Sequence, residues 1–161
     1  MQQKITPNLW YDSEAEEAAS FYTSVFKNSR IVAVTHYTEA GPRPAGMVMT
    51  VEFELDGQRF VGINGGPDFT FNESVSLEIG CETQDEVDYY WQALSEGGQE
   101  GQCGWLKDKF GLSWQVVPTE LYALLADPDP ERVTRATQAL LGMVKLDIAA
   151  LRRAADGGPV S

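Results

Sequence analysis

The chain has 161 residues and a formal net charge of -12, with 43% hydrophobic and 22% charged residues. These values are typical of a folded globular protein and argue against global disorder. The excess of acidic residues repels a phosphate backbone, so we expect no nucleic-acid partner. No apolar stretch approaches the roughly 20 residues that span a bilayer. Strand-like sequence follows directly after Lys4, so we expect no signal peptide, no membrane association and a cytoplasmic location.

The first predicted elements are a strand over residues 5–11 and a helix after it. The strand ends at Asp12-Ser13, where Ser13 and Glu16 have the spacing of a capping box. Beyond this point apolar residues recur at helical spacing and predict one buried helix face. They are Ala15, Ala18, Ala19, Tyr22, Val25 and Phe26.

Three strands are predicted after this helix. Residues 30–37 are rich in β-branched side chains. Residues 47–55 alternate in character, as expected for a sheet with two unlike faces. Asp56-Gly57 is typical of a hairpin turn and leads into a strand over 59–64, which ends at Gly65-Gly66-Pro67.

The same order of elements recurs at an offset of 70 residues. A strand over 74–81 ends at a second capping box, formed by Thr83 and Glu86, and the next helix stops at Gly97-Gly98, a C-cap signal. Three shorter strands are predicted after these glycines, over 99–103, 105–107 and 112–117. The order βαβββ, given twice with short connections, predicts an α+β fold with antiparallel pairing rather than a doubly wound sheet.

The sequence from Thr119 onward predicts a helical extension. The turn Asp127-Pro128-Asp129-Pro130 contains a helix start, because proline fits the first helical turn. Asp147 can cap a last helix. We therefore expect a paired βαβββ domain over 1–118 and a helical extension over 119–161. The sequence leaves open whether the extension packs on that domain or on a second subunit.

Two cysteines, Cys81 and Cys103, and one histidine, His36, are the only thiol and imidazole groups in the chain. They lack the number and spacing of a structural zinc site, so we expect none. Both cysteines are interpreted as buried small hydrophobes. His36 falls on the second strand, towards a sheet edge, where a surface role is the ordinary interpretation and a general base is the alternative.

Several segments together resemble a known family. Residues 17–26, Glu-Ala-Ala-Ser-Phe-Tyr-Thr-Ser-Val-Phe, are similar to the EEA-x-x-FY-x-x-VF helix of PhnB-like proteins. Residues 64–67, 81–88 and 101–115 resemble further signatures of one subgroup, which is often labelled as a demethylubiquinone 3-methyltransferase family. The resemblance runs from about residue 5 to residue 118.

This resemblance implies the vicinal-oxygen-chelate (glyoxalase-like) fold. In that fold two βαβββ modules form a cupped, mixed and mainly antiparallel sheet, helices cover its outer face, and the pocket lies in the cup. Family members are commonly dimers, so a homodimer is expected.

The family's metal sites imply where the ligands would lie. Metal-using relatives take one ligand from the first and last strand of each module, and the metal binds two neighbouring substrate oxygens. Alignment places Thr6 and Ser76 on the opening strands and Asn64 and Gln115 on the closing strands. All four side chains are neutral and would hold a divalent metal weakly, so we expect no metal and no other cofactor.

Four polar groups facing one cavity suit a small organic ligand instead. Further candidate contacts share the same strand faces: Asn8, Trp10 and Glu78. The ordinary structural role of such groups is hydrogen bonding to each other or to water.

Two alternatives to a metal-free binding protein stay open. One is an enzyme of this superfamily, an isomerase, lyase or dioxygenase, that uses Glu78, His36 or a weakly held metal; its catalytic residues are unassigned. The other is the methyltransferase that the family label names. Methyltransferases using S-adenosylmethionine normally have a glycine-rich strand-to-helix turn and an acidic residue after the next strand, and the sequence has neither. The label is therefore interpreted as inherited.

Overall fold

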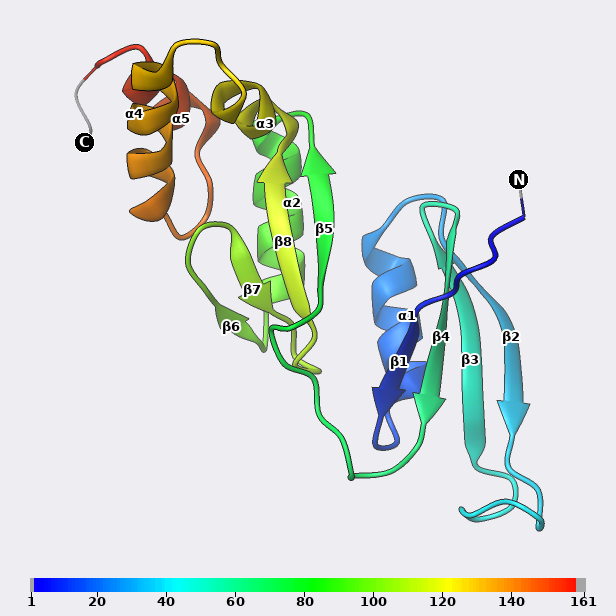
Figure 1. Cartoon of the computed structure of the whole chain (residues 1–161). Coiled ribbons are helices and arrows are strands. Elements are labelled where there is room, and N and C mark those ends of the chain that lie inside the picture. Colours follow the sequence, from blue (N-terminus) through cyan, green and yellow to red (C-terminus); the bar gives the residue numbers. More distant parts are fainter. Residues whose placement is uncertain (1, 159–161) are drawn as a thin grey trace. The chain divides into compact units, whose positions relative to one another are not determined.

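The computed structural model describes residues 2–158, which form two compact units. The division falls between Phe71 and Asn72, between the two modules, and not between residues 118 and 119. The second module and the helical extension therefore share one unit. Both units have the predicted α+β composition (Figure 1).

The first unit has one helix and a four-stranded sheet. Its elements are β1 (Asn8–Tyr11), α1 (Ala15–Val25), β2 (Arg30–His36), β3 (Val48–Leu55) and β4 (Gln58–Asn64). The strand order is β1-β4-β3-β2, with β1 parallel to β4 and the other pairs antiparallel. The hairpin between β3 and β4 forms as predicted, because Asp56 and Gly57 both adopt positive φ, at 47° and 80°.

The core of the first unit lies between α1 and one face of this sheet. The predicted helix face is buried through Ala15, Ala18, Ala19, Tyr22 and Val25. Tyr22 lies 6.1 Å from Phe53 on β3, and Phe53 stacks on Phe60 of β4 at 5.6 Å, measured between ring centroids. The alternation predicted over 47–55 is confirmed, since Val51, Phe53 and Leu55 are buried while their neighbours are half-buried. The other sheet face carries no helix of this unit (Figure 1).

The predicted capping box at Ser13 is wrong. The N-cap residue of α1 is Glu14, which makes no side-chain capping hydrogen bond, and the Glu14 carboxylate instead accepts from the Ser13 amide at 2.8 Å. His36 lies on the exposed edge strand β2, as predicted.

The second unit repeats the topology and adds three helices. Its module contains β5 (Ser76–Cys81), α2 (Gln84–Ser95), β6 (Gln99–Glu100), β7 (Trp105–Lys107) and β8 (Ser113–Pro118), in the strand order β5-β8-β7-β6. The extension contains α3 (Thr119–Leu125), α4 (Pro130–Leu141) and α5 (Ile148–Ala155). Strand β6 is shorter than predicted, because the Gly101 amide turns back to the Trp105 carbonyl and Cys103 adopts a φ of 58°.

The caps predicted at Thr83 and Asp147 in the second unit are confirmed. Thr83 accepts from the Glu86 amide at 3.2 Å, while Glu86 accepts from the Glu82 amide, one residue before the expected reciprocal partner. Asp129 and Asp147 cap α4 and α5 in the same local way.

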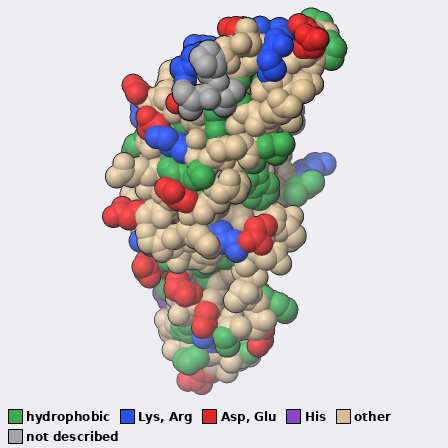
Figure 2. Space-filling view, turned by 90° about the vertical axis from the view of Figure 1, so that its left-hand side faces the viewer, with side chains coloured by type: hydrophobic (Ala, Val, Ile, Leu, Met, Phe, Trp, Pro, Cys, Tyr) green, Lys and Arg blue, Asp and Glu red, His purple; other side chains and the backbone are tan. Residues whose placement is uncertain are grey.

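The extension packs on the second module of its own chain. Its helices share one buried cluster with the end of β8: Val117, Leu121, Leu124, Ala136, Ala139, Leu146, Leu151, Ala154 and Ala155. Gln84 of α2 ties the two parts together, donating to the Leu146 carbonyl at 3.0 Å and accepting from the Ile148 amide at 2.9 Å. Basic and acidic side chains are interspersed over the upper, extension-bearing part of the face in Figure 2.

Of the two cysteines predicted to be buried, one is confirmed in this unit. Trp91 and Trp114 are buried between α2 and the sheet, and so is Cys81, whereas Cys103 is half-buried. Burial raises the pKa of the Cys81 thiol to about 12, with a smaller contribution from the negative charge of Glu86. Within residues 2–158, no helix has the length and apolar character needed to cross a bilayer.

Candidate functional site

The face of the second sheet opposite α2 carries two rows of side chains. Strand register places Glu78, Gln115 and Trp105 side by side across β5, β8 and β7. The next row contains Ser76, Ser113 and Lys107 on the same three strands, and Gln99 of β6 continues it. Partners across a sheet project from the same face, so these residues form one polar surface, here called the open face of the second unit.

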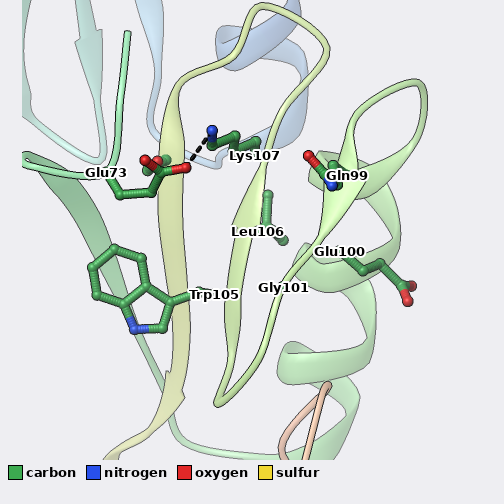
Figure 3. Close-up of a pocket in the computed structure, with 8 residues that line it drawn as sticks. Glu73, Gln99, Glu100, Gly101, Trp105, Leu106 and Lys107 are labelled. Atoms are coloured by element: carbon green, nitrogen blue, oxygen red, sulfur yellow. Dashed lines mark ion pairs between the residues drawn. The ribbon is translucent and has the colours of Figure 1, made fainter.

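A cavity of about 190 Å³ opens on this face (Figure 3). Its lining residues come from β6, β7, β8 and the segment before β5: Glu73, Gln99, Glu100, Gly101, Trp105, Leu106, Lys107 and Ser113. Figure 3 shows the Lys107 ammonium group directed at the Glu73 carboxylate, with which it forms an ion pair. The hydrogen bond from Lys107 is the main cause that lowers the pKa of Glu73, so this carboxylate stays ionised at neutral pH.

Ser113 supplies an unsatisfied hydroxyl to the cavity. Its side chain is fully buried, and its Oγ has no hydrogen-bond partner among residues 2–158. Leaving a buried hydroxyl unpaired costs about 1–3 kcal/mol. The Oγ is closed off from solvent in this conformation, so a ligand polar atom in the cavity would pair with it only after the Ser113 side chain rotates.

Three residues predicted for the site lie together on the open face of the second unit. Gln115 Nε2 donates to Ser76 Oγ at 2.9 Å, so these two polar groups partly satisfy each other. Glu78 is exposed, and its Oε1 accepts a hydrogen bond from the Tyr122 hydroxyl of α3.

Asn8 and Trp10 lie on the helix-free face of the first sheet, since their neighbours Leu9 and Tyr11 are buried under α1. Trp10 is already well packed. Its indole Nε1 donates to the Gly66 carbonyl at 2.9 Å, and its ring meets Phe69 edge-on at 5.0 Å. A Cβ at Gly65 would lie 2.2 Å from the Trp10 ring, so only glycine allows this approach.

Thr6 precedes the strand rather than lying in it. Strand β1 begins at Asn8, and the Thr6 carbonyl accepts from Asn8 Nδ2 at 3.0 Å. The Thr6 side chain itself is half-buried.

Asn64 does not share a face with the other predicted residues. Strand register pairs Asn64 with Tyr11 and Gln115 with Glu78. Asn64 therefore lies on the helix-covered side, where it is 2% exposed. Its Oδ1 accepts from the Ala15 amide at 2.8 Å, and its Nδ2 donates to the Val48 carbonyl at 3.0 Å. This side chain caps α1 from across the unit and replaces the capping box expected at Ser13.

The donor groups of the site are a poor set for a divalent metal. Within the part of the chain that the structure describes, no three His, Cys, Asp or Glu side chains are grouped so as to hold one. Glu78 is the only carboxylate in the two rows of the open face of the second unit, and its row neighbour Gln115 is neutral. One carboxylate with amides and hydroxyls gives weak binding of zinc, nickel or iron.

Four of the residues missed from the sequence at this face are Trp105, Lys107, Ser113 and Tyr122. For the first three a signal existed, because the runs 105–107 and 113–115 alternate with period two around Leu106 and Trp114, which are buried. Tyr122 gave no such signal, since a lone exposed tyrosine on a short helix has no pattern.

Comparisons with known proteins place this geometry in a family. A family model described as 3-demethylubiquinone-9 3-methyltransferase matches residues 3–117. The solved structure of a putative 3-demethylubiquinone-9 3-methyltransferase, PhnB protein, from Bacillus cereus is 39% identical, with a TM-score of 0.67. That match covers 73% of this chain and 100% of the Bacillus chain.

More distant solved structures show the same fold. Protein PA1353 from Pseudomonas aeruginosa is 20% identical, with a TM-score of 0.60, over 73% of this chain and 98% of its own. The fosfomycin resistance protein FosX from Mesorhizobium loti is 11% identical, with a TM-score of 0.56, over 79% of this chain and 99% of its own. None of the curated proteins matches the sequence. The chain belongs to the family described as 3-demethylubiquinone-9 3-methyltransferase, in the PhnB-like branch of the glyoxalase-like fold.

Proposed function

We propose that the protein binds a small organic molecule on the open face of its second unit, without a tightly bound metal. The observation that carries this proposal is the cavity beside Trp105, in which the buried Ser113 hydroxyl has no partner among the described residues. Trp105 offers a flat apolar surface, Ser113 offers a hydrogen bond, and Gln115 and Ser76 supply a polar margin. Such a mixture of one aromatic wall and few polar groups is typical of small-molecule sites.

The size of the cavity limits the ligand. Pockets for drug-sized molecules measure about 300–1,000 Å³, and the present cavity measures about 190 Å³. It therefore suits one ring with a short substituent, or one end of a larger molecule.

In the first unit, we propose Asn8, Trp10 and Thr6 as ligand contacts of the helix-free sheet face. Asn64 is left out, because both polar atoms of its amide serve α1 and β3. Since Trp10 is packed on Gly65 and Phe69, it offers a fixed ring edge rather than a freely turning one.

The alternative function is an enzyme activity, and the family description names methyl transfer. A thermal-shift screen with quinones, aromatic amines, aromatic carboxylates and S-adenosylmethionine separates the two. Stabilisation by an aromatic compound alone supports the binding proposal. Stabilisation by the methyl donor, lost when the cavity is filled, would favour the transferase.

Two variants connect any binding to this cavity. Trp105→Ala should weaken a compound found in the screen by at least about tenfold, equal to about 1.4 kcal/mol. Ser113→Ala should weaken binding too, yet raise the free energy of unfolding by about 1 kcal/mol, because it removes the unsatisfied hydroxyl. Tyr89→Ala is the control, since Tyr89 is an exposed aromatic residue on α2, on the covered side of the same sheet. Binding that neither cavity variant changes would contradict the proposal, as would near-stoichiometric zinc, nickel, manganese or iron in protein purified without chelator.

We also propose that the protein is a homodimer, as its family resemblance implies, and that it is located in the cytoplasm. Light scattering coupled to gel filtration should then give twice the chain mass of 17.8 kDa. A mass equal to that of one chain at micromolar concentration would contradict the dimer.

A further inference from the structure

The extension reaches the open face of the second unit through its first helix. The family model ends at residue 117, and α3 begins at Thr119. The Bacillus chain is matched over its full length by 73% of this chain. Side chains of α3 that reach the site therefore come from outside the region that the family model covers.

The rotation of α3 about its axis is set by the helix face that packs on the rest of the extension. Leu121 and Leu124 are buried in the extension cluster, and Glu120 forms an ion pair with Arg152 of α5. These contacts leave Thr119 and Tyr122, one helical turn apart, directed at β5. Thr119 Cγ2 lies where a side chain at Gly80 would meet it at 3.4 Å, and the Tyr122 hydroxyl donates to Glu78 Oε1.

Glu78, the only carboxylate in the two rows, forms no ion pair with a basic side chain among the described residues. Lys107 is paired with Glu73. For Glu78, no Lys or Arg lies within ion-pair distance among the described residues, and its one hydrogen bond there comes from Tyr122. A carboxylate that accepts a hydrogen bond from a neutral hydroxyl gains a fixed orientation.

We infer that Tyr122 determines the ligand specificity of this site by holding Glu78 as the receptor for a cationic amine. Glu78 and Trp105 lie in one row with β8 between them, so their backbones are about 10 Å apart. A ligand with a flat aromatic ring and an ammonium group on a short chain places the ring on Trp105 and the charge on Glu78. The preferred ligand class is therefore an arylalkylamine. This inference rests on the proposed function.

Tryptamine and indole-3-propionate are matched probes, because they share the ring and differ in the sign of the terminal charge. Isothermal titration calorimetry of the full chain should give tryptamine an affinity at least about tenfold higher. Glu78→Gln should abolish this preference. Tyr122→Phe removes only the hydroxyl and should reduce the preference about three- to tenfold, since the carboxylate loses its fixed orientation. Tyr89→Phe is the matched control, because Tyr89 is 51% exposed and Tyr122 is 52% exposed, and it should leave the preference unchanged.

The outcomes separate the two proposals. If neither probe binds, or if Trp105→Ala leaves their binding unchanged, the proposed ligand site is wrong and the inference falls with it. If both probes bind at Trp105 with equal affinity, or if Tyr122→Phe keeps the full preference, the ligand site stands and the role of Tyr122 is refuted. Far-UV circular dichroism of each variant identifies any loss of fold.

Discussion

The two units start their first helix by different means, although their strand topology is the same. In the second unit Thr83, next to the helix in sequence, caps α2. In the first unit Asn64, at the end of β4, caps α1 by accepting from the Ala15 amide. A local cap depends on a few neighbouring residues, whereas a cap from a distant strand ties the helix to the sheet. The comparison shows that two modules with the same order of elements can give different roles to residues at corresponding positions.

The sheet faces opposite α1 and α2 also differ. In the first unit the polar groups are largely paired, with ion pairs between Glu52 and Arg59 and between Glu54 and Arg30. In the second unit Ser113 is unpaired among the described residues and Glu78 has a hydroxyl as its partner. Each unit has one buried polar atom without a partner among the described residues, Arg59 Nε in the first and Ser113 Oγ in the second. The two faces therefore differ in Glu78, which has a hydroxyl as its partner where Glu52 and Glu54 each have an arginine.

The largest expected effect tests the distant cap. Asn64→Ala removes a buried acceptor and donor and leaves the Ala15 amide and Val48 carbonyl without them, so it should lower the free energy of unfolding by about 3 kcal/mol. Gln115→Ala removes a half-buried amide with one hydrogen bond to Ser76 and should cost less than about 1 kcal/mol. Urea denaturation followed by far-UV circular dichroism measures both. An equal loss of free energy of unfolding in the two variants would contradict the capping role of Asn64.

An intermediate effect concerns Cys81, whose position in the first unit is taken by Tyr11. The folded thiol has a pKa of about 12 against an ordinary value of 9.0. Between these values the unfolded chain loses a proton that the folded chain keeps, so stability falls as the pH rises, by about 1.4 kcal/mol per pH unit. Well below pH 9 the thiol is protonated in both states and contributes no slope. Cys81→Ala should remove this loss, measured as the difference between the two proteins from pH 8 to pH 10.5. Parallel curves would show that the thiol does not titrate on unfolding.

The smallest expected effect compares the residues at the two local N-caps. Thr83→Ala should lower the free energy of unfolding by about 1 kcal/mol, because the Glu86 amide loses its acceptor. Glu14→Ala should change it by less than about 0.5 kcal/mol, since Glu14 makes no side-chain cap to α1. Thermal and urea unfolding of both variants test this, and a larger cost for Glu14→Ala would contradict the assignment of the α1 cap to Asn64.

Most elements were predictable from sequence where the signal is local. The caps at Asp129 and Asp147, the turn at Asp56-Gly57 and the buried stripe of α1 each depend on residues within one or two turns of chain. The first strand was predicted three residues too early, and the strand over 99–103 ends at Glu100. The predicted ends of strands are wrong more often than the predicted strands themselves, because hydrogen bonds across the sheet set where strand pairing ends.

The site was predictable only in part. Ser76 and Gln115 were found because the family resemblance implies ligand positions on their strands. Glu78 was found because period-two alternation assigns it to the same strand face as Ser76. Asn64 was aligned with Gln115 by its place at the end of a strand, and the register shows that it belongs to the opposite side. A change of one residue in strand register moves a side chain to the other face of the sheet. The register depends on the partner strand, so the sequence of one strand alone does not determine it.

The sequence by itself determined the two βαβββ units, their local helix caps and the helical character of the extension, because these depend on neighbours along the chain. Only the tertiary structure decided that the extension packs on its own second module, that Asn64 caps α1, and that Tyr122 meets Glu78. The two hydrogen bonds among these contacts each join residues more than 40 positions apart. Such contacts depend on strand register and helix rotation, which are set by the packing of the whole unit and not by any local pattern.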